Sequence, residues 1–174
     1  MNKVQKAQRR AKKGNHDGDS LPIPQKFGDA VTCDHKILNE DDSDRAENQN
    51  IFVIQDKATS WLQAYASQRK SADETVKAFQ RFYQPGEQPL HTYSDNSKEI
   101  KLACETLKFS HDTSPPHRSE TNGIAERAIR RVKEGTACTL TQSGFTDHWW
   151  TQAMTAFCFM RCVVDELDSG RTAY

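Results

Sequence analysis

The chain lacks several features that would place it outside the cell or in a membrane. No apolar run approaches the roughly 18 residues of a membrane-spanning helix, and the N-terminus has no apolar stretch of the secretory type. Its five cysteines form no C-x-x-C pair, which argues against both a disulfide framework and a zinc knuckle. We therefore expect a soluble intracellular protein with no membrane partner and with reduced, mostly buried thiols.

An excess of either charge is also missing, because 24 Lys and Arg residues balance 24 Asp and Glu residues. Whole-chain electrostatics would not draw such a protein onto a polyanion, so any contact with nucleic acid must come from local patches. One patch is residues 1–13, which hold six basic side chains and no acid. This composition predicts a disordered basic arm. The arm could contact DNA phosphates, act as a nuclear import signal, or do neither.

A length of 174 residues allows one domain with a substantial core. Apolar alternation and helical spacing predict an α/β fold. The expected strands cover 29–37, 51–54, 61–65, 90–94 and 108–112, and the expected helices cover 73–83, 97–107, a segment around Glu126, and 146–164. Residues 39–50 contain five acids and one base, which predicts a solvated loop, with metal binding by these acids as the alternative.

Some conspicuous side chains have a structural and a functional interpretation. Asp56 lies in an expected turn, which favours a turn residue over a metal ligand. His111 either assists chemistry or supports a strand end. Cys158 and Cys162 lie four residues apart on an apolar helix, which favours core packing over metal binding. Trp149 and Trp150 belong either to the core or to a contact between copies of the chain.

Three carboxylates stand where a phosphoryl-transfer site would need them. Asp34 lies on the first expected strand, Asp95 at the C-terminal end of a short strand, and Glu126 near the start of a helix. Strand ends are where catalytic groups gather in open α/β sheets. Two divalent ions about 3.5–4 Å apart need shared and separate oxygen ligands, which three carboxylates can supply. The pattern predicts catalytic and metal-binding roles for all three.

The helix that carries Glu126 is expected to be amphipathic, with its apolar and charged residues on opposite sides. The apolar arc contains Ile124, Ala125, Ala128, Ile129 and Val132. The charged arc contains four basic residues that are candidates for phosphate contacts, of which we expect two to make them: Arg127, Arg130, Arg131 and Lys133. The alternative is an ordinary solvated face with a Glu-to-Arg pair one turn apart.

These stretches resemble the catalytic core of retroviral and retrotransposon integrases. Residues 122–127 read Asn-Gly-Ile-Ala-Glu-Arg, which is similar to the stretch that contains the last acid of the family's D,D,E triad. Residues 94–96 read Ser-Asp-Asn, which is similar to the stretch that contains the second acid. Asp34 matches the first acid, and residues 144–156 are similar to the helix that follows the core in copia-type elements. The resemblance implies a ribonuclease H-like fold, with a five-stranded mixed sheet and helices on both faces, over residues 28–165.

The resemblance also implies an activity and partners. The implied activity is DNA integration by 3′-end processing and strand transfer, with two Mg²⁺ or Mn²⁺ ions as cofactors. The implied partners are DNA ends, target DNA and further copies of the chain in a homo-oligomer, and the implied location is the nucleus. Residues 1–27 would be a basic arm and linker, and 166–174 a tail. Glu120 is an alternative third acid. Residues 1–27 hold only His16 of the family's usual zinc ligands. A catalytically inactive nucleic-acid-binding remnant, a partner-binding domain and a ribonuclease are therefore alternatives.

Overall fold

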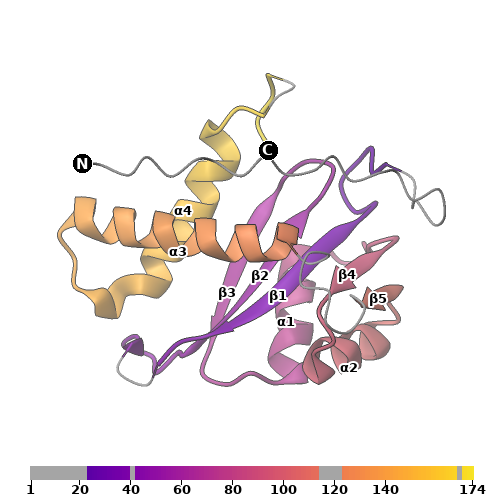
Figure 1. Cartoon of the computed structure of the whole chain (residues 1–174), viewed down its shortest axis with the longest axis horizontal. Helices are drawn as coiled ribbons and strands as arrows, with labels where there is room; N and C mark the ends of the chain where they lie inside the picture. Colours follow the sequence, from indigo (N-terminus) through magenta and orange to yellow (C-terminus); the bar gives the residue numbers. More distant parts are fainter. Residues whose placement is uncertain (1–22, 40–41, 114–122, 168–169) are drawn as a thin grey trace, which may run out of the picture.

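The computed structural model describes residues 23–39, 42–113, 123–167 and 170–174. Within them the chain forms a five-stranded mixed sheet in the order β3-β2-β1-β4-β5 (Figure 1). The strands are β1 (Val31–Ile37), β2 (Asn50–Asp56), β3 (Leu62–Ser67), β4 (Thr92–Ser94) and β5 (His111–Thr113). The first three pair antiparallel, whereas β4 lies parallel to both β1 and β5. The predicted mixed sheet is therefore confirmed.

Helices cover both faces of this sheet, as predicted (Figure 1). They are α1 (Ala72–Phe82), α2 (Lys98–Leu107), α3 (Gly123–Ser143) and α4 (Trp150–Val164), with a short 3-10 turn, η3 (Asp147–Trp149), before α4. The start of α1 is fixed by Ser71, whose side chain accepts a hydrogen bond from the backbone N–H of Glu74. No described helix combines the length and the apolar composition that crossing a bilayer requires.

Alternation along β1 and β2 divides the apolar residues between two cores. Val31, Cys33, Phe52 and Ile54 pack against α1 and α2, in what we call the aromatic face. On the other side, which we call the α3/α4 face, the strand residues that join the core are Ile51, Val53, Leu62 and Ala64. Four of the five cysteines are buried, Cys158 and Cys162 among them, so their interpretation as core residues is confirmed.

The expected strand at 108–112 begins three residues late, for a local reason. Lys108 ends α2 in the left-handed conformation with φ 59°, and its backbone N–H bonds back to the helix carbonyls. The backbone N–H of Phe109 also bonds to Cys104, so the chain is still closing the helix there. Only from His111 is the backbone free to pair with β4.

The α3 helix buries a narrower stripe than its sequence predicts. Ala125, Ala128, Val132, Thr136 and Leu140 are buried, following helical spacing along one side. Two expectations are wrong at the edges of this stripe: Ile124 is 39% exposed, and Arg131 is half-buried. Ile124 lies beside the buried stripe and not within it, and α4 packs along the flank that holds Arg131.

The described part of the acidic 39–50 segment is anchored and not simply solvated, because Asp44 is only 6% exposed. Its carboxylate accepts hydrogen bonds from the backbone of Ala46 and Asn48 and from the hydroxyl of Thr151 on α4. Burial raises the pKa of Asp44, but the hydrogen bonds from Thr151 and Asn48 outweigh it, so the pKa lies below its ordinary value. The loop is thereby fastened to α4.

Packing contacts also involve residues outside the predicted core domain of residues 28–165. Phe27 stacks on Phe82 with ring centroids 5.6 Å apart. At the other end, the backbone N–H of Tyr174 bonds to the carbonyl of Cys162, and its ring lies against Trp61. Residues 1–22, which hold most of the expected basic arm, lie outside the described residues.

Candidate active site

Asp34 and Asp95 lie side by side on neighbouring parallel strands. The last paired residues of β1 and β4 are Cys33 and Ser94, and each aspartate comes one residue later. Adjacent strands are about 4.8 Å apart, so the two carboxylates start from neighbouring backbone positions. Asp34 also stands opposite Val53 in the antiparallel ladder, and Val53 belongs to the core under α3 and α4. Both aspartates therefore belong to the sheet face that α3 covers.

The charge environment of Asp34 shows that Glu126 belongs to the same neighbourhood. Partial burial, followed by the negative charge of Asp95, raises the pKa of Asp34 to about 6, and the charge of Glu126 adds to the rise. A hydrogen bond of 2.7 Å from the backbone N–H of His35 and the charge of Lys70 act in the opposite direction. The structure thus brings the three predicted carboxylates to one side of the sheet.

The three carboxylates do not form a closed ligand cluster. Among the residues that the structure describes, no three His, Cys, Asp or Glu side chains are grouped closely enough to hold a metal ion. Asp95 uses one oxygen to accept a hydrogen bond of 3.1 Å from the backbone N–H of Ser97. Glu126 is exposed in the first turn of α3. The alternative acid Glu120 lies outside the described residues.

His111 supports the end of β4 directly beneath Asp95. The hydroxyl of Ser94 lies 2.8 Å from His111 Nε2 and donates a hydrogen bond to the carbonyl of Asp95. Because the hydroxyl has one proton, the ring must be the donor in their contact, which selects the Nε2–H tautomer. Burial, followed by the charge of Lys101, lowers the pKa of His111. The structural interpretation of His111 is the one these contacts favour.

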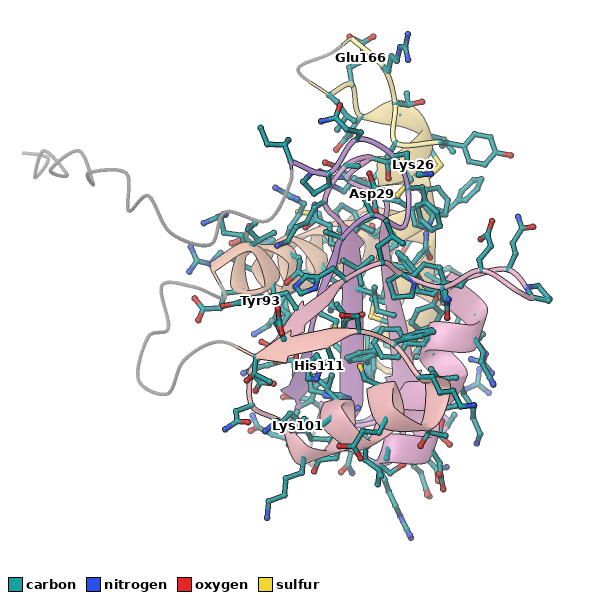
Figure 2. All side chains as sticks on the ribbon, turned by 90° about the vertical axis from the view of Figure 1, so that its right-hand side faces the viewer. Lys26, Asp29, Tyr93, Lys101, His111 and Glu166 are labelled. Carbon is teal, nitrogen blue, oxygen red and sulfur yellow. The ribbon has the colours of Figure 1, made fainter. Side chains whose placement is uncertain are left out.

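Two residues on the same sheet face were not singled out from the sequence. Tyr93 precedes Asp95 by two positions and so shares its face, with Lys57 Nζ 5.2 Å from the centre of the Tyr93 ring. Figure 2 shows Tyr93 near His111 at this edge of the sheet. Burial lowers the pKa of Lys57. The two-residue spacing could have indicated Tyr93, but Lys57 arrives from the β2–β3 turn and has no such signal.

The four basic residues of α3 separate into two rows. Arg130 and Lys133 follow Glu126 at helical spacing and are exposed, so they share its side of the helix. Arg127 and Arg131 lie on the adjoining row, of which Arg131 is half-buried next to α4. The sequence grouped all four on one solvated arc. The structure leaves two of them beside the candidate site and directs Arg131 toward the neighbouring helix.

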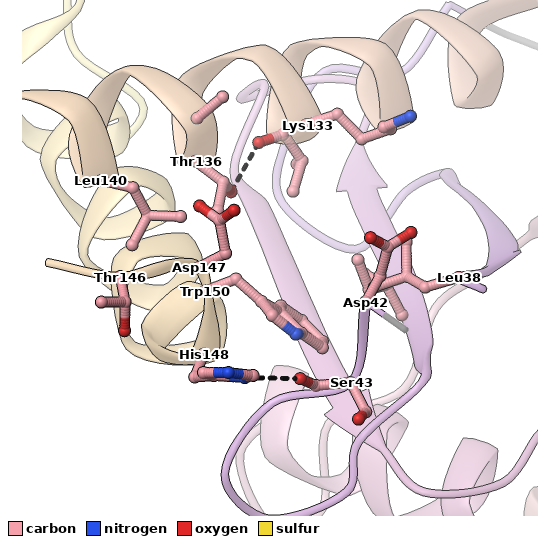
Figure 3. A pocket seen from close by; sticks show the side chains of 13 residues that line it. Leu38, Asp42, Ser43, Lys133, Thr136, Leu140, Thr146, Asp147, His148 and Trp150 are labelled. Atoms are coloured by element: carbon pink, nitrogen blue, oxygen red, sulfur yellow. Dashed lines mark hydrogen bonds between the residues drawn. The ribbon is translucent and has the colours of Figure 1, made fainter. Parts of the chain in front are cut away.

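A separate cavity of about 610 Å³ lies between α3, the start of α4 and the loop after β1 (Figure 3). Its walls include Leu38, Val132 and Trp150, and Lys133 stands at the end nearer the carboxylates. The indole Nε1 of Trp150 is buried without a hydrogen-bond partner among the described residues. None of the three candidate catalytic carboxylates lines this cavity.

Comparison with known proteins agrees with this architecture. No family model matches the chain. In sequence it is 24% identical over 123 residues to the retrovirus-related Pol polyprotein from transposon TNT 1-94 of Nicotiana tabacum. That match covers 65% of this chain but only 9% of the polyprotein.

Solved structures define the fold. The chain is similar to the HTLV-2 integrase catalytic core domain in complex with magnesium, with 17% identity, a TM-score of 0.65, and coverage of 84% of this chain and 94% of that one. It is also similar to the BIV integrase core, with 18% identity, a TM-score of 0.60, and coverage of 84% and 91%. A chain of the simian T-cell lymphotropic virus intasome matches with 17% identity and a TM-score of 0.69, covering 91% of this chain and 59% of that one.

These structures place the chain in the ribonuclease H-like fold class of integrase catalytic cores. The chain therefore has a fold like that of integrase catalytic cores, and its sequence is similar to part of a retrotransposon Pol polyprotein.

Proposed function

We propose that this chain is the catalytic core of a retrotransposon integrase, which processes DNA 3′ ends and transfers them to target DNA. The observation that carries the proposal is the register of β1 with β4, which sets Asp34 beside Asp95, with the charge of Glu126 close enough to act on Asp34 as well. Like charges so close raise the free energy of the ionised protein. Phosphoryl transfer needs acidic groups arranged in this way.

The donor chemistry of this group fits Mg²⁺ or Mn²⁺, since hard cations prefer carboxylate oxygens. Asp34, Asp95 and Glu126 would hold two such ions, and the repulsion that raises the pKa of Asp34 is what a cation would relieve. When bound, the ions supply activation of the attacking oxygen and stabilisation of the leaving 3′-oxygen. The integrase core of HTLV-2 was solved in complex with magnesium, which supports the same chemistry here.

The chain's own residues would position the DNA. Arg130 and Lys133, exposed in the row that continues from Glu126, would contact backbone phosphates without reading sequence. Asp34 must lose its proton to bind a cation, so its raised pKa predicts that metal affinity, and with it activity at limiting metal, falls as the pH drops through about 6. Water would attack in end processing and a DNA 3′-hydroxyl in strand transfer, with no covalent bond to the protein.

We also propose a homo-oligomer in the nucleus. The HTLV-2 core was solved in a dimeric and a trimeric form. In this chain Phe159 and Met160 on α4 are each 53% exposed, which gives that helix an apolar surface for a second copy. Sedimentation analysis of the protein and of a Phe159→Ser variant tests the oligomer, because disruption of this interface would lower the sedimenting mass. The nuclear location stays a prediction from the basic residues 1–13.

A second function has one observation in its favour. Because no three described side chains are grouped to hold a metal ion, the chain could be a nucleic-acid-binding remnant of an integrase that has lost its reaction. Such a protein would bind DNA through the basic rows of α3 and would be indifferent to Mg²⁺. It would also tolerate loss of the carboxylates without any change in DNA affinity.

A strand-transfer and disintegration assay with Mg²⁺ or Mn²⁺ separates the two functions. Asp95→Asn and Glu126→Gln should each abolish turnover, whereas the matched control Glu134→Gln, exposed two turns along the same helix, should retain it. DNA binding without turnover in either metal, unchanged by the two substitutions, would leave the remnant as the function of this chain.

A further inference from the structure

Arg161 on α4 has a buried side chain whose guanidinium is poorly matched. The side chain is 10% exposed, and its Nε and Nη1 atoms are buried without a hydrogen-bond partner among the described residues. Its acidic neighbour is Asp165, whose carboxylate is 3.7 Å away and whose side chain is 56% exposed. A buried charge normally has close, hydrogen-bonded partners, because leaving water is costly. Asp165 alone does not meet that need.

The crossing of α3 and α4 brings a second guanidinium to the same place. The two helices meet where Gly135 lies against the ring of Phe157, so closely that a Cβ at position 135 would collide with it. Arg131 lies one helical turn before Gly135, and Arg161 lies one turn after Phe157. Burial, followed by the charge of Arg161, lowers the pKa of Arg131, as expected for two guanidiniums that lie near each other.

Two neighbouring guanidiniums that share one largely exposed carboxylate, at 3.7 Å from Arg161, have donors to spare for an anion with several oxygens. Guanidinium groups present planar pairs of N–H donors that match phosphate oxygens, and they form stronger hydrogen bonds to an anion than to neutral groups. Removal from water strengthens the attraction, since fewer solvent dipoles screen it. The exposed Arg127, one turn before Arg131, adds positive charge at the mouth of the site.

We propose that the crossing of α3 and α4 binds a phosphate group of the DNA backbone between Arg131 and Arg161. The proposal rests on the DNA-binding function proposed above and adds a contact apart from the row of Arg130 and Lys133. That row follows Glu126 on the exposed side of α3, whereas Arg131 lies half-buried on the flank of α3 that faces α4, and Arg161 belongs to α4 itself. A duplex reaching the carboxylates would then be held at two points along α3, which fixes its direction across the helix.

The test is the salt dependence of affinity for a short DNA duplex, measured for the whole chain and for Arg131→Gln and Arg161→Gln. Removal of one phosphate-binding side chain should lower the slope of log affinity against log salt by about 0.9. The control is Arg81→Gln, an exposed arginine at the end of α1, on the aromatic face. Melting temperatures in inorganic phosphate and in chloride, at equal ionic strength, identify variants that fail to fold and show whether free phosphate binds.

The outcomes are distinct. A lower slope in either folded variant, with an unchanged slope in the Arg81 control, supports the proposal. An unchanged slope in both folded variants overturns it but leaves the DNA-binding function standing. Stabilisation by free phosphate that both substitutions remove, without a change of slope, would assign the site to a small anion and overturn the DNA contact. Failure of the unaltered chain to bind DNA would overturn this inference and the proposed function together.

Discussion

The two faces of the sheet differ in the side chains that form their hydrophobic cores. The aromatic face packs ring against ring: Phe79 lies 5.3 Å from Phe52 and 5.5 Å from Phe109, centre to centre. The α3/α4 face combines small side chains such as Ala128 and Cys158 with aliphatic ones, and Trp150 is the one aromatic residue among its buried core members in the described part of the chain. Aromatic residues bury the most area per side chain, so the aromatic face holds more of the stabilising contacts.

Several partly buried charged groups, and the cavity, lie on the α3/α4 side of the sheet. The α3/α4 side carries the half-buried Asp34, the buried Arg161 with its distant partner, and the cavity beside Trp150. Partly buried charges and cavities of this kind cost free energy of folding, so we expect the α3/α4 face to contribute less stability. The difference teaches that the aromatic core and the candidate site occupy opposite sides of the same strands, and β1 shows this within two residues. Asp34 faces α3, whereas His35 faces the ring of Phe52 at 4.4 Å.

The largest expected effect comes from removing the centre of the aromatic face. Phe79 is fully buried, and Phe79→Ala should lower the free energy of unfolding by about 3–5 kcal/mol, because transfer energy and a cavity both count. Urea denaturation measures this, with Val53→Ala as the counterpart on the α3/α4 face. If the Val53 variant lost as much, the faces would contribute equally and the comparison would fail.

A second prediction concerns His35. Burial, followed by the charge of Lys70, lowers its pKa to about 4, below the 6.5 of the unfolded chain. Because the folded state resists protonation of His35, the lowered pKa costs no folding stability above pH 6.5. The loss of stability grows as the pH falls toward 4 and the unfolded chain binds the proton first. At about 1.4 kcal/mol for each pKa unit, and allowing for partial exposure, stability should fall by about 2–3 kcal/mol across that window. His35→Leu should abolish the fall in denaturation profiles; a persisting fall would place its cause elsewhere.

A third prediction concerns the helix crossing. Gly135→Ala adds a methyl group where the Phe157 ring lies, and overpacking of this kind should cost about 1–3 kcal/mol. Thermal unfolding of Gly135→Ala, Phe157→Leu and the double variant measures the coupling. We expect the smaller side chain at position 157 to return part of the loss. Equal costs in both backgrounds would mean that the two residues do not constrain each other.

The smallest effect has the opposite sign. Partial burial and the charge of Asp95 raise the pKa of Asp34 to about 6, above the ordinary value of 3.8, so its ionised form destabilises the fold above that pH. Asp34→Asn should therefore stabilise the protein by about 1–2 kcal/mol at pH 8 and leave it unchanged below pH 4. Denaturation at both pH values tests this. A destabilised Asn variant would show that the Asp34 carboxylate is structural.

The sequence contained most of the fold because the signals are local. Period-two alternation gave the strands, and helical spacing and the Pro85-Gly86 stop gave α1. The short motifs at Asp95 and Glu126 indicated the carboxylates that the structure brings to one face of the sheet. The beginning of β5 was misplaced because the cap of α2 continues through Phe109, and capping by a left-handed Lys108 has no strong composition signal.

Other parts of the site depend on contacts between segments far apart in the sequence. Lys57, after β2, reaches Tyr93 on β4 across the intervening strand β1, and Asp44 binds Thr151 over an interval of 107 residues. No local pattern reports such a pair, since each side chain is ordinary in its own segment. The exposure of Ile124 and the burial of Arg131 follow from where α4 crosses α3, which helical periodicity alone does not fix.

The sequence by itself determined which residues can share a face: Asp34 with its strand neighbours of the same parity, and Arg130 and Lys133 with Glu126. That follows because backbone geometry repeats every two residues in a strand and every 3.6 in a helix. Only the tertiary structure decided which faces meet. The register of β1 with β4 placed Asp34 beside Asp95, and the contact of Gly135 with Phe157 placed Arg131 near Arg161. Both depend on packing between distant segments, where the free energy belongs to the whole fold.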